Sequence, residues 1–213
     1  ELGRRWQDGS ATVAQEHFAS FVIRGRLSGL ARGWGRGRGP RAVLACLWNQ
    51  VEHGTGCPTG MAYAAHAGFA HEPALRIWAE KLCGTQYEFS RKEVAAKPGA
   101  VIGYAMTEKQ GGSDLRQTQT TATFVGTENG VQVYSVTGHK WFFSVPTSDG
   151  FYTLAQTRSG VSCLFVPRFL PDGSANRVAV QRLKDKCGNR SNASSEVEFN
   201  KTWAMLVGEE GRG

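Results

Sequence analysis

The chain has 213 residues, enough to bury a sizeable core, and its two halves differ enough that we favour two domains. Its hydrophobic content of 40% and charged content of 20% are those of an ordinary globular protein rather than a disordered one. No run of residues is apolar enough to span a membrane, and the first residues do not resemble a signal peptide, so we expect a cytoplasmic protein without a membrane partner.

The net charge of +7 and the isoelectric point near 9.4 suit a polyanionic partner, although a modest excess of arginine can also serve only to keep a protein in solution. From Arg24 to Arg41 the chain carries six arginines and six glycines. So much glycine opposes regular structure, and we predict a loop over residues 24–41 that contacts phosphates or is simply solvated.

Five widely spaced cysteines without a Cys-x-x-Cys pair argue against a disulfide framework or a structural zinc site. We interpret them as reduced thiols in the core. The five histidines form no metal-ligand spacing with the cysteines, and no metal site is predicted.

The first half of the chain has helical patterns. Apolar residues recur at helical spacing over residues 41–53, Pro58 suits the first turn of a helix that extends to about His71, and a short helix is expected over residues 74–82.

From Ala100 the pattern changes to alternation of apolar and polar residues. It predicts six strands, separated by glycine-bearing turns, over residues 118–125, 131–137, 151–157, 161–167, 177–183 and 196–199. Short connections between six strands indicate an antiparallel sandwich or barrel. The expected fold class is therefore α+β, with a partial helical domain over residues 1–98 and a β-domain over residues 99–213.

Two stretches of the β-rich half have the composition of a ligand site. The first, Ala105-Met106-Thr107-Glu108-Lys109-Gln110-Gly111-Gly112-Ser113-Asp114, offers small residues and hydroxyls that let a ligand approach the backbone. The second, Gly138-His139-Lys140-Trp141-Phe142-Phe143-Ser144, places aromatic rings beside a hydroxyl, as a planar cofactor requires. The carboxylates of Glu108 and Asp114 could also form an acid–base pair, but their neighbours favour turn contacts.

Other catalytic patterns are excluded. Leu115 stands where a nucleophile elbow needs its second glycine, and the chain has no Gly-Lys-Ser or Gly-Lys-Thr phosphate loop. These absences argue against a hydrolase of that type and against a nucleotide triphosphatase.

Together the two stretches resemble the flavin-binding signature in the middle domain of the acyl-CoA dehydrogenase family. The first departs from the family pattern at Gln117, where a small residue is usual, and the second at Phe142 and Ser144, where tryptophan and threonine are usual. The run from Leu183 to Phe199 is similar to the AidB-like branch of the family, which is the branch of the adaptive response to alkylation damage. The resemblance covers about residues 42–72 and 100–213.

The resemblance implies an FAD site and, with it, a role for each residue. Tyr104, Ala105, Met106 and Thr107 would line the ring edge, with Thr107 also facing the acyl thioester. Ser113, together with Gly111 and Gly112, would meet the flavin diphosphate or the substrate. Phe142 and Phe143 would wall the ring, and Ser144 would donate toward N5. The implied substrate is an acyl-CoA, from which a hydride passes to the flavin.

The resemblance also implies a glutamate base on a third, all-helical domain, which no part of this chain resembles. We therefore expect a fragment that does not dehydrogenate an acyl-CoA alone, from a longer form that is a homo-oligomer. One alternative is a module that binds duplex DNA on a flavoprotein scaffold without significant catalysis, through its basic residues. A purely structural alternative is an incomplete gene product that does not fold well.

Overall fold

The computed structural model describes residues 39–69, 71–111 and 114–213. The chain divides into two compact units, Glu1–Val51 and Glu52–Gly213. The described part of the first unit is helix α3, Gly39–Val51, which agrees closely with the helix predicted over residues 41–53. Most of the predicted arginine- and glycine-rich loop, up to residue 38, lies outside the described residues, and its last residues begin α3.

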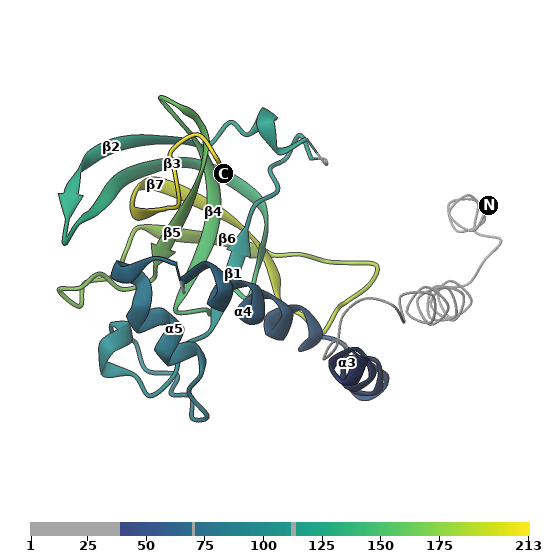
Figure 1. Ribbon diagram of the computed structural model, residues 1–213. Coiled ribbons are helices and arrows are strands. Elements are labelled where there is room, and N and C mark those ends of the chain that lie inside the picture. The colour runs from purple at the N-terminus through teal and green to yellow at the C-terminus, as the bar shows by residue number, and fades with distance from the viewer. Residues whose placement is uncertain (1–38, 70, 112–113) are drawn as a thin grey trace. The chain divides into compact units, whose positions relative to one another are not determined.

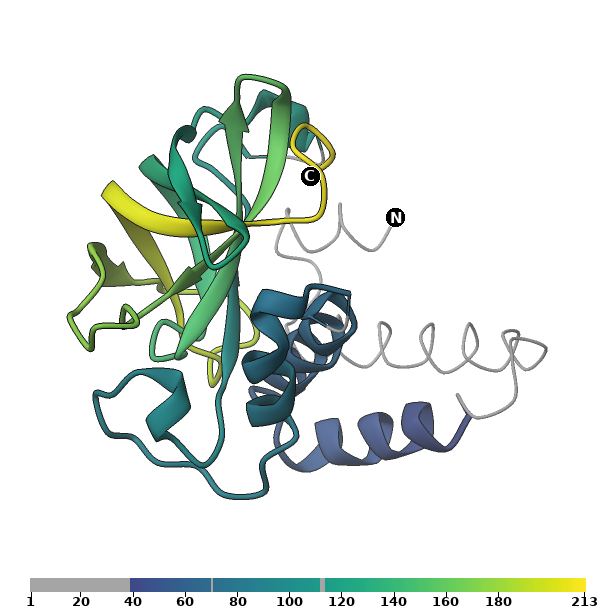
Figure 2. The ribbon, with the colours of Figure 1, turned by 60° about the vertical axis from the view of Figure 1, so that its left-hand side comes forward.

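The second unit begins with helices α4, Gly56–Phe69, and α5, Arg76–Leu82, joined by a short 3-10 turn, η2, Pro73–Leu75. Both helices lie against one side of the sheet, as the two views show (Figure 1, Figure 2). A further 3-10 turn, η3, Val94–Ala96, precedes the strands, and η4, Leu115–Gln117, follows the first strand. The domain boundary predicted near residue 98 falls between η3 and the first strand and stays a prediction.

Seven strands among the described residues form one sheet in the order β1-β3-β2-β4-β5-β7-β6, with additional pairings β1–β4 and β3–β7 that curl it into a barrel-like form. Their bounds are β1 Ile102–Ala105, β2 Thr121–Glu128, β3 Val131–Ser144, β4 Gly150–Thr157, β5 Gly160–Pro167, β6 Val178–Leu183 and β7 Ser194–Val207. Most pairings are antiparallel, and β4 runs parallel to β1 and β2. The predicted α+β class with an antiparallel-rich sheet is confirmed.

The structure differs from the predicted strands in two respects. Strand β1 was not predicted, because its four residues are too few to show alternation. Strands β3 and β7 are each 14 residues long, about twice or more the predicted length. The turn between β2 and β3 is the predicted one: Asn129 and Gly130 have φ values of 51° and 81°, as a two-residue hairpin loop requires.

The inner face of the curled sheet encloses the main core. The rings of Phe143 and Phe151 lie 4.5 Å apart, and Phe199 stacks on Phe151 at 5.8 Å. All three are at most 2% exposed. β-Branched residues such as Val136 and Val197 fill the space between these rings, as is typical of strands that pack face to face.

A second core lies between the helices and the outer side of the sheet. Phe165 on β5 packs against Trp78 of α5 at 4.6 Å and against Phe69 of α4 at 5.0 Å. At the start of β4, Gly150 makes this approach feasible, because a Cβ there would lie 2.4 Å from the Phe165 ring. The helices are therefore held to the sheet by an aromatic cluster.

The cysteines are not core residues as a group, contrary to expectation. Cys46, Cys83 and Cys187 are exposed, and Cys57 and Cys163 are partly buried, all with free thiols. No helix among the described residues combines the length and the apolar character needed to cross a membrane.

Substituting Phe165→Ala tests the helix–sheet core. The ring is fully buried, so its removal should lower the free energy of unfolding by about 3–5 kcal/mol. Phe89→Ala is the control, because this side chain is 88% exposed and its loss should change stability by no more than about 0.5 kcal/mol. Urea unfolding of both variants provides the comparison, and similar costs would contradict the packing of Phe165 between helices and sheet.

Candidate functional site

The two sequence stretches meet because β1 pairs antiparallel with the end of β3. Tyr104 lies opposite Ser144, and Ala105 lies opposite Phe143. Just beyond β1, the carbonyl oxygen of Thr107 accepts hydrogen bonds from the backbone amides of both Trp141, at 2.8 Å, and Phe142, at 3.4 Å. One carbonyl thus fixes two consecutive residues of the second stretch.

A β-bulge turns these two aromatic residues away from the core. The pairing of β3 with β7 shifts register between Lys140 and Phe143, which leaves one extra residue on β3. The flanking residues Lys140 and Phe143 are fully buried, whereas Trp141 is partly exposed and the Phe142 ring is 41% exposed. In a regular strand, two adjacent side chains would point to opposite faces. The bulge is what presents both rings outside the core.

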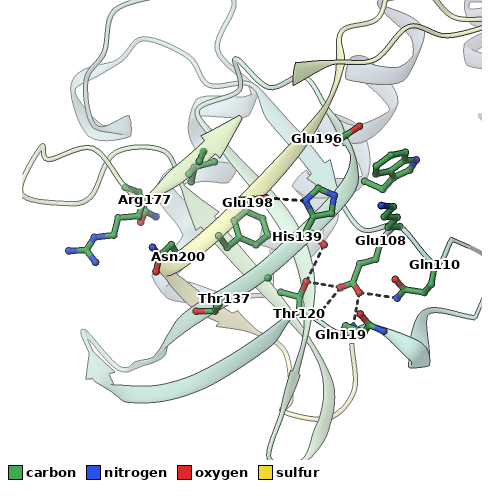
Figure 3. Close-up of a pocket in the computed structure, with 17 residues that line it drawn as sticks. Glu108, Gln110, Gln119, Thr120, Thr137, His139, Arg177, Glu196, Glu198 and Asn200 are labelled. Atoms are coloured by element: carbon green, nitrogen blue, oxygen red, sulfur yellow. Dashed lines mark hydrogen bonds and ion pairs between the residues drawn. The ribbon is translucent and has the colours of Figure 1, made fainter. Parts of the chain in front are cut away.

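A buried ion pair joins the same two stretches. The Lys140 ammonium donates to the Glu108 carboxylate at 2.7 Å, and the two side chains are 0% and 5% exposed. The backbone amides of Gln119 and Thr120, the Thr120 hydroxyl and the Gln110 amide complete the shell around Glu108, at 2.6–3.0 Å (Figure 3). A carboxylate held by five donors is well compensated for its burial.

The pKa values of the pair follow from this shell. Burial alone would raise the pKa of Glu108, but the hydrogen bonds from Gln110, Lys140 and Thr120 outweigh burial and lower the pKa to about 2. Burial lowers the pKa of Lys140, partly offset by Glu108. Because Glu108 stays ionised and fully engaged, it is poorly placed to act as a general acid or base.

Basic residues surround the Trp141 ring. The Lys184 ammonium lies 3.0 Å from the ring centroid of Trp141 and 4.9 Å from that of Phe142. Arg182 and Lys109 each lie 5.8 Å from the Trp141 centroid. Glu196 accepts from both Arg182 and Lys184 at 2.8 Å and anchors their positions. The exposed aromatic face is therefore bordered by positive charge.

Two cavities share Trp141 as a wall. The smaller, about 640 Å³, is also lined by Phe142 and by residues 182–187, with Asp185 its only acidic residue. The larger, about 1190 Å³, is a polar groove over β3, β7 and β6 (Figure 3). Its floor includes the cross-strand pair His139 and Glu198, with His139 Nδ1 and Glu198 Oε1 4.0 Å apart. The smaller cavity combines aromatic walls with basic groups, as an anionic planar ligand requires.

Matches to known families and proteins agree with this geometry. Residues 103–202 match the family "Acyl-CoA dehydrogenase, middle domain", and residues 32–89 match "Adaptive response protein AidB N-terminal domain". The chain is 48% identical over 175 residues to the putative acyl-CoA dehydrogenase AidB of Escherichia coli (strain K12). The aligned region covers 81% of this chain and 32% of that protein.

The chain belongs to the acyl-CoA dehydrogenase family. Within the family it is AidB-like, as predicted. It is also 33% identical over 131 residues to the cyclohexane-1-carbonyl-CoA dehydrogenase of Geobacter metallireducens, over 58% of this chain and 30% of that protein. The chain spans about a third of the length of these curated relatives.

The fold likeness extends to solved structures. The crystal structure of Caenorhabditis elegans ACDH-11 in complex with C11-CoA superposes with a TM-score of 0.61 at 24% identity, over 74% of this chain and 27% of that chain. At this identity the superposition supports the fold alone.

The predicted cofactor residues of this family member differ in how accessible they are. Phe142 is exposed, whereas Ala105 and Phe143 are fully buried, so Phe142 is the ring of the aromatic pair that a ligand can reach here. Tyr104 and Met106 pack against the helix-side core. Thr107 and Ser144 are partly buried and line neither of the two cavities, and Gly111 is exposed with a φ of 74°. Gly112 and Ser113 lie outside the described residues. The roles assigned to these residues stay predictions.

Sequence reasoning gave no role to the charged residues that organise the site, namely Lys140, Arg182, Lys184 and Glu196. Lys140 directly precedes the two aromatic residues, and an isolated lysine within an apolar strand is the signal that could have identified a buried ion pair. The partners of Lys184 come from strands far apart in sequence, so only the fold reveals them.

Replacing Lys140 with methionine tests the pair. It leaves the Glu108 carboxylate buried without its cation, and the free energy of unfolding should fall by about 3–5 kcal/mol. Lys92→Met breaks an exposed pair with Glu88 and should cost no more than about 0.5 kcal/mol. Denaturant titrations of the two variants measure the difference, and equal costs would show that the buried pair is not structurally important.

The pH dependence of stability gives a second test of Glu108. With a folded pKa of about 2 against an ordinary value of 4.5, its carboxylate stabilises the fold above pH 4.5, and this stabilisation is lost as the pH falls toward 2. The stability gap between the parent chain and Glu108→Gln should therefore shrink by up to about 3 kcal/mol between pH 6 and pH 2. Gln110→Ala removes one donor and should give a smaller change of the same sign. A gap that stays constant over this range would be inconsistent with the low pKa.

Proposed function

We propose that this protein is the flavin-binding part of an AidB-like acyl-CoA dehydrogenase flavoprotein, with FAD held against Phe142 and Trp141. The observation that carries the proposal is the β-bulge at these two residues, which the Thr107 carbonyl fixes beside the 640 Å³ cavity. A buried network thus supports an exposed aromatic surface. Exposed apolar surface of this kind marks a place where a ligand or partner binds.

The residues around this cavity fit the chemistry of FAD. The isoalloxazine ring is flat and largely apolar, and the diphosphate is anionic. Phe142 and Trp141 offer ring faces, while Arg182, Lys184 and Lys186 offer positive charge. In this proposal the ring extends beyond the cavity toward Thr107 and Ser144, which hydrogen-bond its edge. Tyr104 and Ala105 of β1 and the adjacent Met106 support the ring, and Gly111, Gly112 and Ser113 approach the diphosphate. Phe143 supports the bulge from within the core.

Bound FAD supplies a hydride acceptor, and the reaction that we propose for the whole protein is oxidation of an acyl-CoA. The contribution of this chain is to bind and orient the ring and to exclude water from one of its faces. The α-proton must also leave, which requires a base. We propose that this base comes from a part of the protein beyond this chain, so that the chain alone does not turn over an acyl-CoA.

The proposed partners follow from the family. The solved ACDH-11 structure is a complex with C11-CoA, and we propose an acyl-CoA as substrate here. A homo-oligomeric full-length form and a cytoplasmic location are part of the same proposal. The alternative of a duplex-DNA-binding module rests on arginines between residues 24 and 41 that lie outside the described residues or whose side chains are not described, and so it gains no support from the site.

Replacement of Phe142 tests the flavin proposal. A chimera in which residues 52–213 replace the matching segment of the E. coli relative supplies the rest of the protein. Phe142→Ala should weaken FAD binding at least about tenfold, measured by quenching of flavin fluorescence, because it removes the exposed ring face. Phe89→Ala, which truncates an exposed phenylalanine outside the site, should leave the affinity unchanged. A chimera that binds no flavin, or equal affinities in both variants, would refute the proposal.

A further inference from the structure

A separate cavity of about 210 Å³ lies where the helical segments meet the far end of the sheet. It is bounded by α5, η3, the β2–β3 hairpin, the segment after β5, and β7. Val133 lines this cavity, and Phe143 stands ten residues further along β3. At about 3.3 Å per residue, the cavity and the flavin candidate site are at most roughly 30 Å apart along β3. The flavin proposal makes no use of it.

Aromatic side chains form its walls. Trp78 comes from α5, Phe169 follows β5, and Trp203 comes from β7. Trp78 is 5% exposed and fixed by Phe165 at 4.6 Å, so its ring cannot readily turn away. Proline and aliphatic residues fill the spaces between the rings. Three aromatic residues from separate segments therefore line the cavity, and one of them is fixed in place.

The charged residues that line the cavity are both acidic. Glu93 accepts a hydrogen bond from the amide of Ala95 at 3.2 Å, and Glu128 accepts from the indole of Trp203 at 3.4 Å. Glu128 also sits at the two-residue turn formed by Asn129 and Gly130, which fixes its backbone. Although the chain has a net charge of +7, the charged residues that line this aromatic cavity are acidic, so the cavity favours a cationic ligand.

We propose that this cavity binds a small organic cation, specifically a methylated ammonium group. The negative faces of aromatic rings attract cations, and methyl groups on nitrogen fill an apolar box without the hydration that an inorganic cation would lose. The two carboxylates more than offset the single positive charge of the ligand. Since an apolar protein cavity of about 150 Å³ can hold benzene, a space of 210 Å³ accommodates about eight non-hydrogen atoms, which is close to the size of choline.

The first experiment compares two probes of the same shape on the unmodified protein. Choline carries the charge, and 3,3-dimethylbutan-1-ol is its neutral analogue. Calorimetric titration at fixed ionic strength should show that choline binds at least about tenfold more tightly. Equal affinities would reduce the site to an apolar cavity, and an absence of choline binding at millimolar concentration would also overturn the proposal.

Variants locate the binding. Glu128→Gln keeps the shape of the side chain and removes its charge, and Trp203→Leu removes one π face; each should weaken choline binding at least about fivefold. Glu80→Gln removes an exposed carboxylate on α5 that does not line the cavity, and it should leave choline binding unchanged. An equal loss in the Glu80 variant would assign the effect to overall charge and refute the site.

A peptide probe distinguishes two sources of the ligand, a modified protein and a free metabolite. A short peptide with a trimethylated lysine presents the same group on a protein chain. Tighter binding of this peptide than of choline assigns the site to a modified protein, and tighter binding of choline assigns it to a free metabolite. Both results support recognition of a methylated ammonium group, and binding of neither refutes it.

Discussion

The arrangement of the site depends on one buried interaction, the ion pair between Glu108 and Lys140. Each partner is adjacent to one of the residues that build the bulge, Thr107 on one side and Trp141 on the other. Inside the protein, a charge without a partner is costly, so this pair tolerates little displacement of either segment. The segment that follows β1 is thereby held in one register against β3, and the exposed aromatic surface inherits its rigidity.

The barrel-like sheet makes that register possible. β3 pairs with β1, β2 and β7, and so the bulge lies on a strand that is held on both sides. The aromatic cluster around Phe165 then locks α4 and α5 onto the outside of the sheet. The helices contribute no side chain to the flavin candidate site, and what they provide is a fixed support for the strands that do.

Much of this fold could be predicted from the sequence, because alternation and turn residues are local signals. The Asn129-Gly130 turn and the cores of six strands are examples. The site was predictable only in part. The motif around Thr107 identified the right neighbourhood, but the bulge depends on how β3 pairs with β7, and a register shift leaves no mark in the spacing of residues. For the same reason the burial of Phe143 and the exposure of Phe142, which are adjacent in the chain, were not distinguished.

The indole of Trp141 lines both the larger groove and the smaller cavity, and the Lys184 ammonium lies against the ring. Because this one side chain lines both spaces, a substitution at Trp141 alters the polar groove over β3, β7 and β6 and the smaller cavity beside Phe142 at the same time.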